Sequence, residues 1–162
     1  MKITFLAASV LIAVGLSHSA FAADDASALV GAWKLVSFKI RLVDTNEMKD
    51  ALGPKPHGRL ILTKNGYITN FRVSDGRKPP KTDADRAELL KTMAGWTGRY
   101  RVDANKIIIN IDASWTEILT GTETVRTYTL EGNKLTLSNT ISSSLFFPGR
   151  AAVGDEIFER EE

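Results

Sequence analysis

The sequence predicts an all-β protein in which eight antiparallel strands close into an up-and-down barrel, with one short helix between the third and fourth strands. Most of the chain alternates apolar and polar residues, the pattern of strands with one buried face. Short turn signals such as Asn-Gly separate most of these segments and favour antiparallel neighbours. Eight such strands can close a barrel whose interior is filled by side chains or holds one small ligand. The expected strands are 29–44, 59–63, 67–73, 96–103, 106–115, 122–130, 134–141 and 155–161.

The first 22 residues have the features of a cleaved secretory signal peptide. Lys2 precedes an apolar run over 3–16, and Ala-Phe-Ala at 20–22 provides an A-x-A cleavage pattern. The run is shorter than the roughly 20 residues that a membrane span requires, with an uncleaved anchor as the alternative. We therefore expect a signal peptide over 1–22 and one barrel domain over 23–162, periplasmic or secreted, without an integral membrane segment.

Composition limits the partners and the chemistry of this domain. Loss of Lys2 leaves 20 of the 21 basic residues against 19 acidic ones, and a formal charge of +1 argues against nucleic-acid binding. The chain has no cysteine, so an exported domain must depend on its hydrophobic core for stability. One histidine after the signal peptide, His57, does not make a usual zinc site. Phosphate-loop, dinucleotide and G-x-S-x-G motifs are absent from the sequence, so we expect no metal and no cofactor. The oligomeric state stays open.

The first strand, 29–44, changes its apolar face partway along. Trp33 and Leu35 share one side. The other side carries Val36, Phe38, Ile40 and Leu42. A β-bulge or sharp bend between the two halves would bring both sets to the interior, and barrels use such bends.

A hairpin, a loop and the helix follow. Asn65-Gly66 between two apolar runs is a strong hairpin signal, whereas the paired prolines of 74–81 exclude a helix interior or a central strand. The helix is expected over 82–95, with Thr82 and Asp85 forming a capping box and the final glycine as its stop. It carries an apolar stripe, and we expect it to cover one mouth of the barrel.

Turn residues also separate the later strands. Ala104-Asn105 and Glu131-Gly132-Asn133 are expected to form tight turns. Gly98 within a strand indicates a close backbone approach or barrel curvature. The segment 142–154 is expected to be a longer link, whose Phe146-Phe147 pair either rings a portal or plugs a barrel end.

Gly31-Ala32-Trp33 matches the G-x-W signature of lipocalins and related calycin barrels. The blocks LVGAWKLVSF, LGPKPHGRLILTKNGYI, GRYRVD and VRTYTLEGNKLTLS resemble, in order and spacing, the lipocalin-like domain family of bacteria and fungi. The resemblance covers 29–160 and departs from the family between residues 114 and 125, at one barrel mouth. It implies an eight-stranded barrel with a ligand cavity, and a structural contact in which Arg160 covers Trp33 at the closed end.

Arg126 is the most informative charged residue. In ETVRTYTLEG it shares a strand face with Tyr128 and Leu130, the more apolar side. Inside a barrel its charge needs an ion-pair partner or a bound anion, and if the face is reversed it is solvated. Glu117 and Glu123 are close in sequence, but Glu123 alternates to the opposite face. The Arg-x-Tyr pair is similar in chemistry to the carboxylate grip of fatty-acid-binding proteins, so both residues are candidate anchors for the polar end of an amphipathic ligand.

Three aromatic residues complete the candidate ligand-binding set. Tyr100 and Phe71 lie on strand faces shared with other large residues, and core packing is the alternative role. Trp115 lies near a loop, where it either lines a portal or plugs the barrel. We interpret one basic cluster as solvated surface, with contact to an anionic surface as the alternative; it consists of Arg72, Arg77, Lys78 and Lys81.

These residues favour a protein that binds a small apolar or amphipathic molecule in its barrel cavity, with no catalytic residue. Two alternatives stay open. One is an isomerase or cyclase that steadies developing negative charge with Arg126, Tyr100 or Tyr128. The other is a solidly packed barrel that interacts through its loops. The volume and lining of the interior separate these possibilities.

Overall fold

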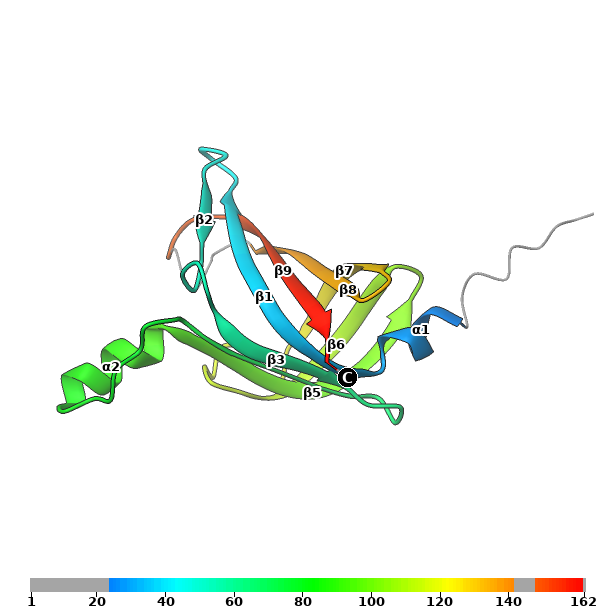
Figure 1. Cartoon of the computed structure of the whole chain (residues 1–162), viewed down its shortest axis with the longest axis horizontal. Helices are drawn as coiled ribbons and strands as arrows, with labels where there is room; N and C mark the ends of the chain where they lie inside the picture. The colour runs from blue at the N-terminus through cyan, green and yellow to red at the C-terminus, as the bar shows by residue number, and fades with distance from the viewer. Residues whose placement is uncertain (1–23, 142–147, 162) are drawn as a thin grey trace, which may run out of the picture.

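A computed structural model describes residues 24–141 and 148–161. Eight antiparallel strands form a closed barrel, because the first strand pairs with the last as well as with its neighbour in sequence (Figure 1). The strands are β1 (Gly31–Leu42), β2 (Met48–Asp50), β3 (His57–Leu62), β4 (Tyr67–Val73), β5 (Met93–Asp103), β6 (Lys106–Ser114), β7 (Glu123–Glu131), β8 (Lys134–Ile141) and β9 (Ala152–Arg160). The helices are α1 (Asp24–Leu29) and α2 (Asp83–Lys91).

The predicted all-β, eight-stranded barrel is confirmed, with two additions at its edges. β2 is a short ninth strand that pairs only with the second half of β1. α1, which the sequence analysis did not predict, precedes β1 directly. The proposed signal peptide and the Phe146-Phe147 pair lie outside the described residues. In the described part of the chain, neither helix has the length and apolar character needed to cross a membrane.

The predicted bulge in β1 is confirmed. Its register against β9 shifts between Leu35 and Ser37, and the intervening Val36 turns outward. The shift brings Leu35 and Phe38, which would otherwise lie on opposite faces, into the interior together. The expectation that both apolar sets lie inside therefore holds except for Val36, which is 41% exposed at the bulge.

The three tight turns also form where the sequence places them. β3 and β4 are joined at Gly66, whose φ is 82°, and β7 and β8 at Gly132, whose φ is 59°. The turn between β5 and β6 uses Ala104 with a φ of 51°, a conformation that is uncommon for a residue with a side chain. The short connections fix each strand beside the next one in sequence.

The helix prediction over 82–95 is correct at its start and wrong at its end. Thr82 and Asp85 form the capping box, but the helix stops at Lys91 and residues from Met93 onward belong to β5. The sheet takes these residues because Ala94 and Trp96 bury their side chains in the barrel.

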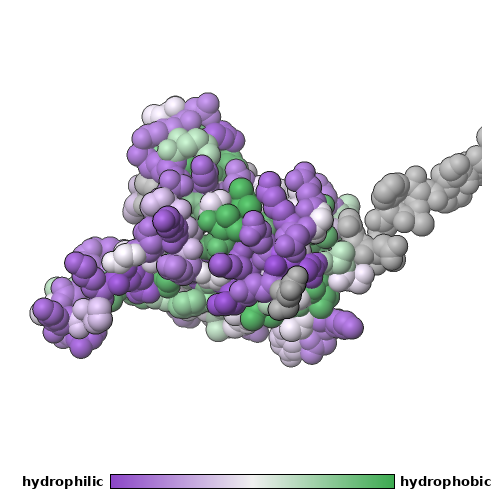
Figure 2. Space-filling view, in the orientation of Figure 1, coloured by the Kyte–Doolittle hydropathy of each residue, from purple (hydrophilic) through white to green (hydrophobic). Residues whose placement is uncertain are grey.

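α2 does not cover a barrel mouth, contrary to expectation. It projects from the barrel (Figure 1), and none of its residues, all of which the structure describes, is buried. The face of α2 seen in Figure 2 is mostly hydrophilic. Leu90 of the expected apolar stripe is 48% exposed, and Ala94 belongs to β5 instead.

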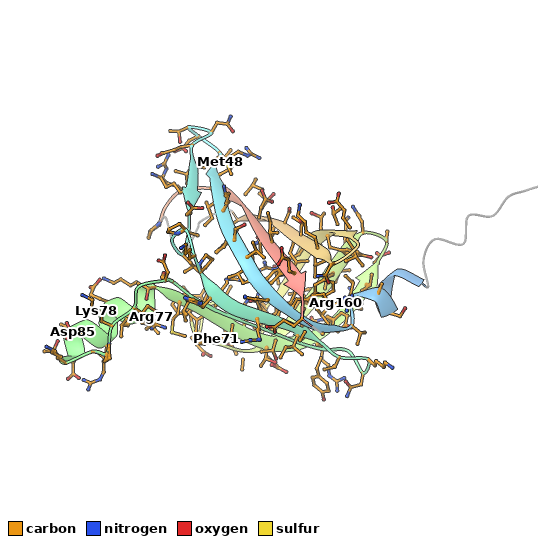
Figure 3. All side chains as sticks on the ribbon, in the orientation of Figure 1. Met48, Phe71, Arg77, Lys78, Asp85 and Arg160 are labelled. Carbon is orange, nitrogen blue, oxygen red and sulfur yellow. The ribbon has the colours of Figure 1, made fainter. Side chains whose placement is uncertain are left out.

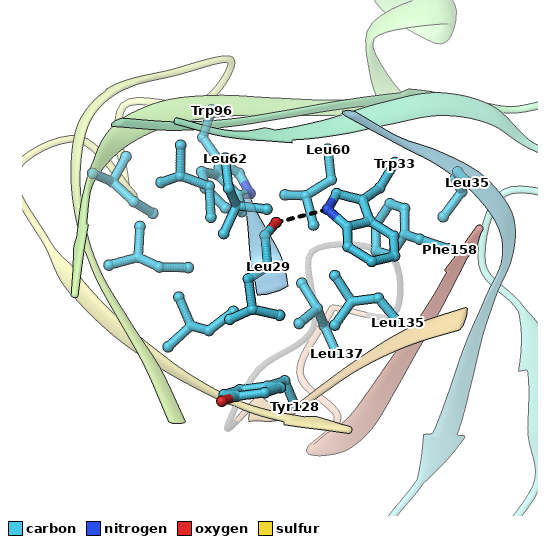
Figure 4. Packing of buried hydrophobic residues seen from close by; sticks show 14 residues of the cluster. Leu29, Trp33, Leu35, Leu60, Leu62, Trp96, Tyr128, Leu135, Leu137 and Phe158 are labelled. Atoms are coloured by element: carbon cyan, nitrogen blue, oxygen red, sulfur yellow. Dashed lines mark hydrogen bonds between the residues drawn. The ribbon is translucent and has the colours of Figure 1, made fainter. Parts of the chain in front are cut away.

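The main hydrophobic cluster fills the end of the barrel next to α1 (Figure 4). Every barrel strand contributes to it, and Leu29 of α1 is fully buried within it. Trp33 Nε1 donates a hydrogen bond to the Leu29 carbonyl at 2.9 Å. The Arg160 guanidinium lies 4.0 Å from the centre of the Trp33 ring and donates to the carbonyls of Ala28 and Val30. Arg160 therefore both covers the tryptophan and satisfies the end of α1.

At Gly98 the backbones of β5 and β6 approach each other closely. The β5–β6 register shifts at this residue, and a Cβ atom there would lie 2.1 Å from the backbone oxygen of Asn110. We expect Gly98→Ala to lower the free energy of unfolding by about 1–3 kcal/mol, because backbone must move to admit the methyl group. Urea denaturation monitored by circular dichroism measures the change.

Gly95→Ala on the same strand is the matched control. Its added Cβ would come within 2.8 Å of the ring of Phe71, a side chain that is 49% exposed, whereas the nearest backbone atom, the Asn70 oxygen, would lie at an ordinary contact distance of 3.7 Å. The control should change the unfolding free energy by less than about 0.5 kcal/mol. Equal losses in the two variants would contradict the close backbone approach at Gly98.

Candidate functional site

The barrel interior is not completely filled by side chains. A cavity of about 270 Å³ lies further from α1 along the strands than the main cluster. Phe38 on one side and Trp96 and Ile111 on the other bound it, so it occupies the junction between the two hydrophobic clusters. Its lining comprises Phe38, Arg72, Ala94, Trp96, Ile111, Trp115, Ile118, Leu119, Thr124, Arg126, Asn139, Thr140, Ile141 and Glu156.

One carboxylate and two guanidiniums form the polar wall of this cavity. The Glu156 side chain accepts hydrogen bonds from Arg72 Nη1 and Arg126 Nη1, one at each carboxylate oxygen. Asn70 Nδ2 donates to the same carboxylate at 2.8 Å. Exposure is 0% for Glu156, 5% for Arg72 and 6% for Arg126, so this ion cluster is shielded from solvent. Its formal charge is +1.

Strand alternation brings these four residues together. Asn70 and Arg72 follow Ile68 on the inner face of β4, Arg126 precedes Tyr128 on that of β7, and Glu156 precedes Phe158 on that of β9; all of these residues are buried. The three strands are not neighbours in the sheet. The ion cluster therefore links strands across the interior of the barrel.

The electrostatics reflect an excess of positive charge. Burial by itself raises the pKa of Glu156, but the charges of Arg72 and Arg126 and the hydrogen bonds from Asn70 and Arg126 hold that pKa below its usual value. Burial lowers the pKa of Arg72 to about 10; Glu156 opposes this shift, and the nearby charge of Arg126 adds to it. Glu156 and Arg72 are therefore both charged at pH 7. Aromatic rings also contact the cations, with Phe38 4.8 Å from Arg72 and Trp96 5.4 Å from Arg126, measured from ring centre to Cζ.

Four buried polar atoms of the lining have no hydrogen-bond partner among the described residues. They are the donors Arg72 Nε, Arg126 Nε and Trp115 Nε1, and the acceptor Asn139 Oδ1. An unsatisfied buried polar group costs about 1–3 kcal/mol, and most such groups in native proteins find a partner. All four atoms belong to residues that line this one cavity.

Two residues of the predicted ligand-binding set lie at the cavity. Arg126 faces inward and is paired with Glu156, and Trp115 lines the mouth. Trp115 belongs with Ile118 and Leu119 to the segment between β6 and β7. This segment lies within residues 114–125, where the sequence is expected to depart from the family pattern, and it contributes three residues to the cavity lining.

The two tyrosines of that set do not line the cavity. Tyr128 is buried in the main cluster, and its hydroxyl donates to the Ala104 carbonyl at 3.3 Å. Tyr100 packs against the same cluster and donates to the Thr63 carbonyl at 3.0 Å. The Arg-x-Tyr pair of β7 shares one strand face, but its two members serve different parts of the interior.

The expectation that Phe71 lines the cavity is wrong. Phe71 lies on the outer face of β4 and is 49% exposed (Figure 3). Tyr67, which is 40% exposed, and Thr69 lie on the same outer face. The inner face of this strand carries Asn70 and Arg72 instead. Strand alternation usually places the larger apolar residues on the buried face. In β4 the aromatic residues lie outside, because the interior at this level is polar.

Arg72 and Glu156 are the functional residues that sequence reasoning missed. The expectation that Arg72 belongs to a solvated basic cluster is wrong, because Arg72 is buried, whereas Arg77, Lys78 and Lys81 are exposed. Glu156 could have been found because it shares a strand face with Phe158 and lies in a strand that alternates clearly. Its pairing with Arg72, 84 positions earlier, gives no local signal.

A comparison with known families agrees with this architecture. A family model described as a lipocalin-like domain matches residues 30–153. The chain belongs to the lipocalin-like domain family. No curated protein matches the sequence. The family and the barrel together indicate small-ligand binding in general terms, and the lipocalin-like barrel of this chain has a cavity in the corresponding interior.

Glu156→Gln tests the role of the carboxylate in folding. The substitution leaves two buried guanidiniums without a counter-charge, and removing one partner of a buried ion pair costs about 3–5 kcal/mol. We expect a loss of that size in the free energy of unfolding at pH 7, measured by urea denaturation. Glu159→Gln, an exposed position on the same strand, is the control and should change stability by less than about 0.5 kcal/mol.

Acid should weaken the wild-type protein more than the Glu156→Gln variant. The pKa of Glu156 is below its usual 4.5 in the folded state, so the unfolded chain takes up its proton at a higher pH. The stabilisation is complete above about pH 4.5 and is lost as the pH falls through the folded-state pKa. Urea denaturation of the wild type and of Glu156→Gln at a series of pH values from about 7 to about 3, which includes the range where carboxylates titrate, measures this difference. Parallel curves for the two proteins would contradict it.

Proposed function

We propose that this protein binds one small amphipathic molecule inside its barrel. The apolar body of the molecule lies against Phe38, Ile111 and Leu119, and its polar end meets the wall formed by Arg72 and Arg126. The observation that carries the proposal is the coincidence of a hollow interior with four unpartnered polar atoms of its lining, counted among the described residues. A barrel filled by its own side chains would have neither this cavity nor buried polar atoms that lack a partner around it.

The size of the cavity limits the ligand. At about 270 Å³ the cavity is near the lower end of the roughly 300–1,000 Å³ found for small-molecule sites. Burial of apolar surface contributes about 25 cal/mol per Å² to binding, and the polar wall fixes the orientation. A compact ligand of a few carbon–carbon bonds in length suits this space better than a long-chain lipid.

Export is part of the same proposal. The basic start, short apolar run and A-x-A pattern of residues 1–22 support secretion or delivery to the periplasm. A carrier or scavenger in that compartment would meet small amphipathic molecules directly. Pulse labelling followed by N-terminal sequencing of the exported product tests whether the chain is cleaved after Ala22.

Ala94→Leu tests occupancy of the cavity. Ala94 is 3% exposed and lines the cavity, so a larger side chain there takes up ligand space without cutting a hydrogen bond. We expect the variant to fold and to lose most of the small molecule that co-purifies with the wild type. Solvent extraction and mass spectrometry, normalised to protein, measure the bound material.

Ala113→Leu is the matched control, because Ala113 is exposed on the neighbouring strand β6. It should retain the wild-type amount of bound material. If Ala94→Leu retained that amount as well, the ligand would not occupy this cavity and the proposal would fail.

A further inference from the structure

We propose that the ligand is a small carboxylate with a single negative charge, anchored by the guanidiniums of Arg72 and Arg126. This inference rests on the proposed function and narrows it to one chemical class. It follows from the charge of the polar wall, from the hydrogen-bonding groups that Glu156 leaves unused, and from the limited size of the cavity.

Charge is the first step. Of the described residues that line the cavity, only Arg72, Arg126 and Glu156 carry charge, and they sum to +1. A buried charge without a counter-charge is expensive, so one negative charge completes the site. A second negative charge would be uncompensated in the same shielded space. An ammonium group would add to the existing excess and is excluded.

Hydrogen bonding is the second step. Glu156 uses the Nη1 atoms of both arginines, while their Nε atoms and Trp115 Nε1 have no acceptor among the described residues. A carboxylate is an acceptor-only group with two oxygens and about four lone-pair sites, which matches a wall of unused donors. Three of the four unpartnered lining atoms are donors, and the fourth is the acceptor Asn139 Oδ1. A hydroxyl group offers fewer acceptor sites than a carboxylate, and the one donor that it brings could serve only Asn139. The carboxylate is therefore the better complement.

Glu156 holds the two arginines ready for this role. Its two oxygens bind one guanidinium each, and Asn70 adds a third hydrogen bond that fixes the carboxylate. Phe38 and Trp96 pack against the two cations. The arginines are thus held in place before a ligand arrives, which reduces the entropy that binding must overcome.

The apolar lining requires a tail on the carboxylate. Ile111, Ile118, Leu119 and Ile141 share the cavity with the polar wall. A medium-length alkyl carboxylate satisfies both halves of the lining and fits the limited volume. Sodium octanoate is therefore a suitable probe, and 1-octanol and octylammonium chloride provide the same tail with a neutral and a cationic head group.

Isothermal titration calorimetry of the purified protein at pH 7 compares these three probes with sodium acetate, which lacks the tail. We expect octanoate to bind about ten- to a hundredfold more tightly than 1-octanol, the range set by hydrogen bonds to charged groups. Octylammonium and acetate should bind more weakly than octanoate. This head-group series needs no variant and so does not depend on any substituted protein folding.

Arg126→Met then tests the anchor. It leaves Arg72 and Glu156 as a neutral pair, so octanoate affinity should fall about ten- to a hundredfold while 1-octanol affinity persists. Arg101→Met is the control, because Arg101 is exposed and pairs only loosely with Glu123, at 3.6 Å. It removes the same charge from the protein as a whole and should leave octanoate binding unchanged.

The outcomes separate the two proposals. If 1-octanol bound as tightly as octanoate, or if Arg126→Met bound octanoate like the wild type, the carboxylate inference would be wrong and the amphipathic ligand would stand. Acetate binding equal to octanoate would overturn the requirement for a tail. If none of the alkyl probes bound, both the inference and the proposed function would fall.

Discussion

The ionised carboxylate of Glu156 is the interaction on which the interior of this barrel depends. A fully buried carboxylate survives only where hydrogen bonds and opposite charges replace water, and Asn70, Arg72 and Arg126 supply them. Because these donors come from strands that are not adjacent, the interior width and the relative heights of β4, β7 and β9 must suit one another. The contact therefore constrains the barrel as much as any apolar residue does.

The barrel divides its interior between two tasks. Next to α1, Trp33, Leu29 and Phe158 pack without exposure, and Arg160 completes that end through a ring contact and two carbonyls. Further along the strands the same sheet encloses the polar wall and the cavity. The packed cluster at the closed end offsets the stability that the cavity and its buried charges remove, and a chain without cysteine has no disulfide to contribute.

Local sequence signals predicted most of the backbone and little of the polar wall. The Asn65-Gly66 turn, the capping box of Thr82 and the face change between Leu35 and Phe38 each depend on residues close in sequence, and each is present. The inner face of β4 was misjudged because its buried residues are Asn70 and Arg72. Glu156 meets them only after the barrel closes, so no short-range pattern joins them. Helix α2 ended early because pairing with β4 claims Met93 and the residues after it.

The segment between β4 and β5, which contains α2, is attached to the barrel only at its two ends. Its base is closed by a hydrogen bond from Ser74 N to the Thr92 carbonyl at 2.9 Å, so the chain leaves and re-enters the sheet at nearly one point. The residues beyond that base, 75–91, are exposed or half-buried, and none of them belongs to either hydrophobic cluster. Such a segment can diverge, shorten or be replaced by a foreign peptide without disturbing the strands that carry it, which makes it a natural position for epitope grafting.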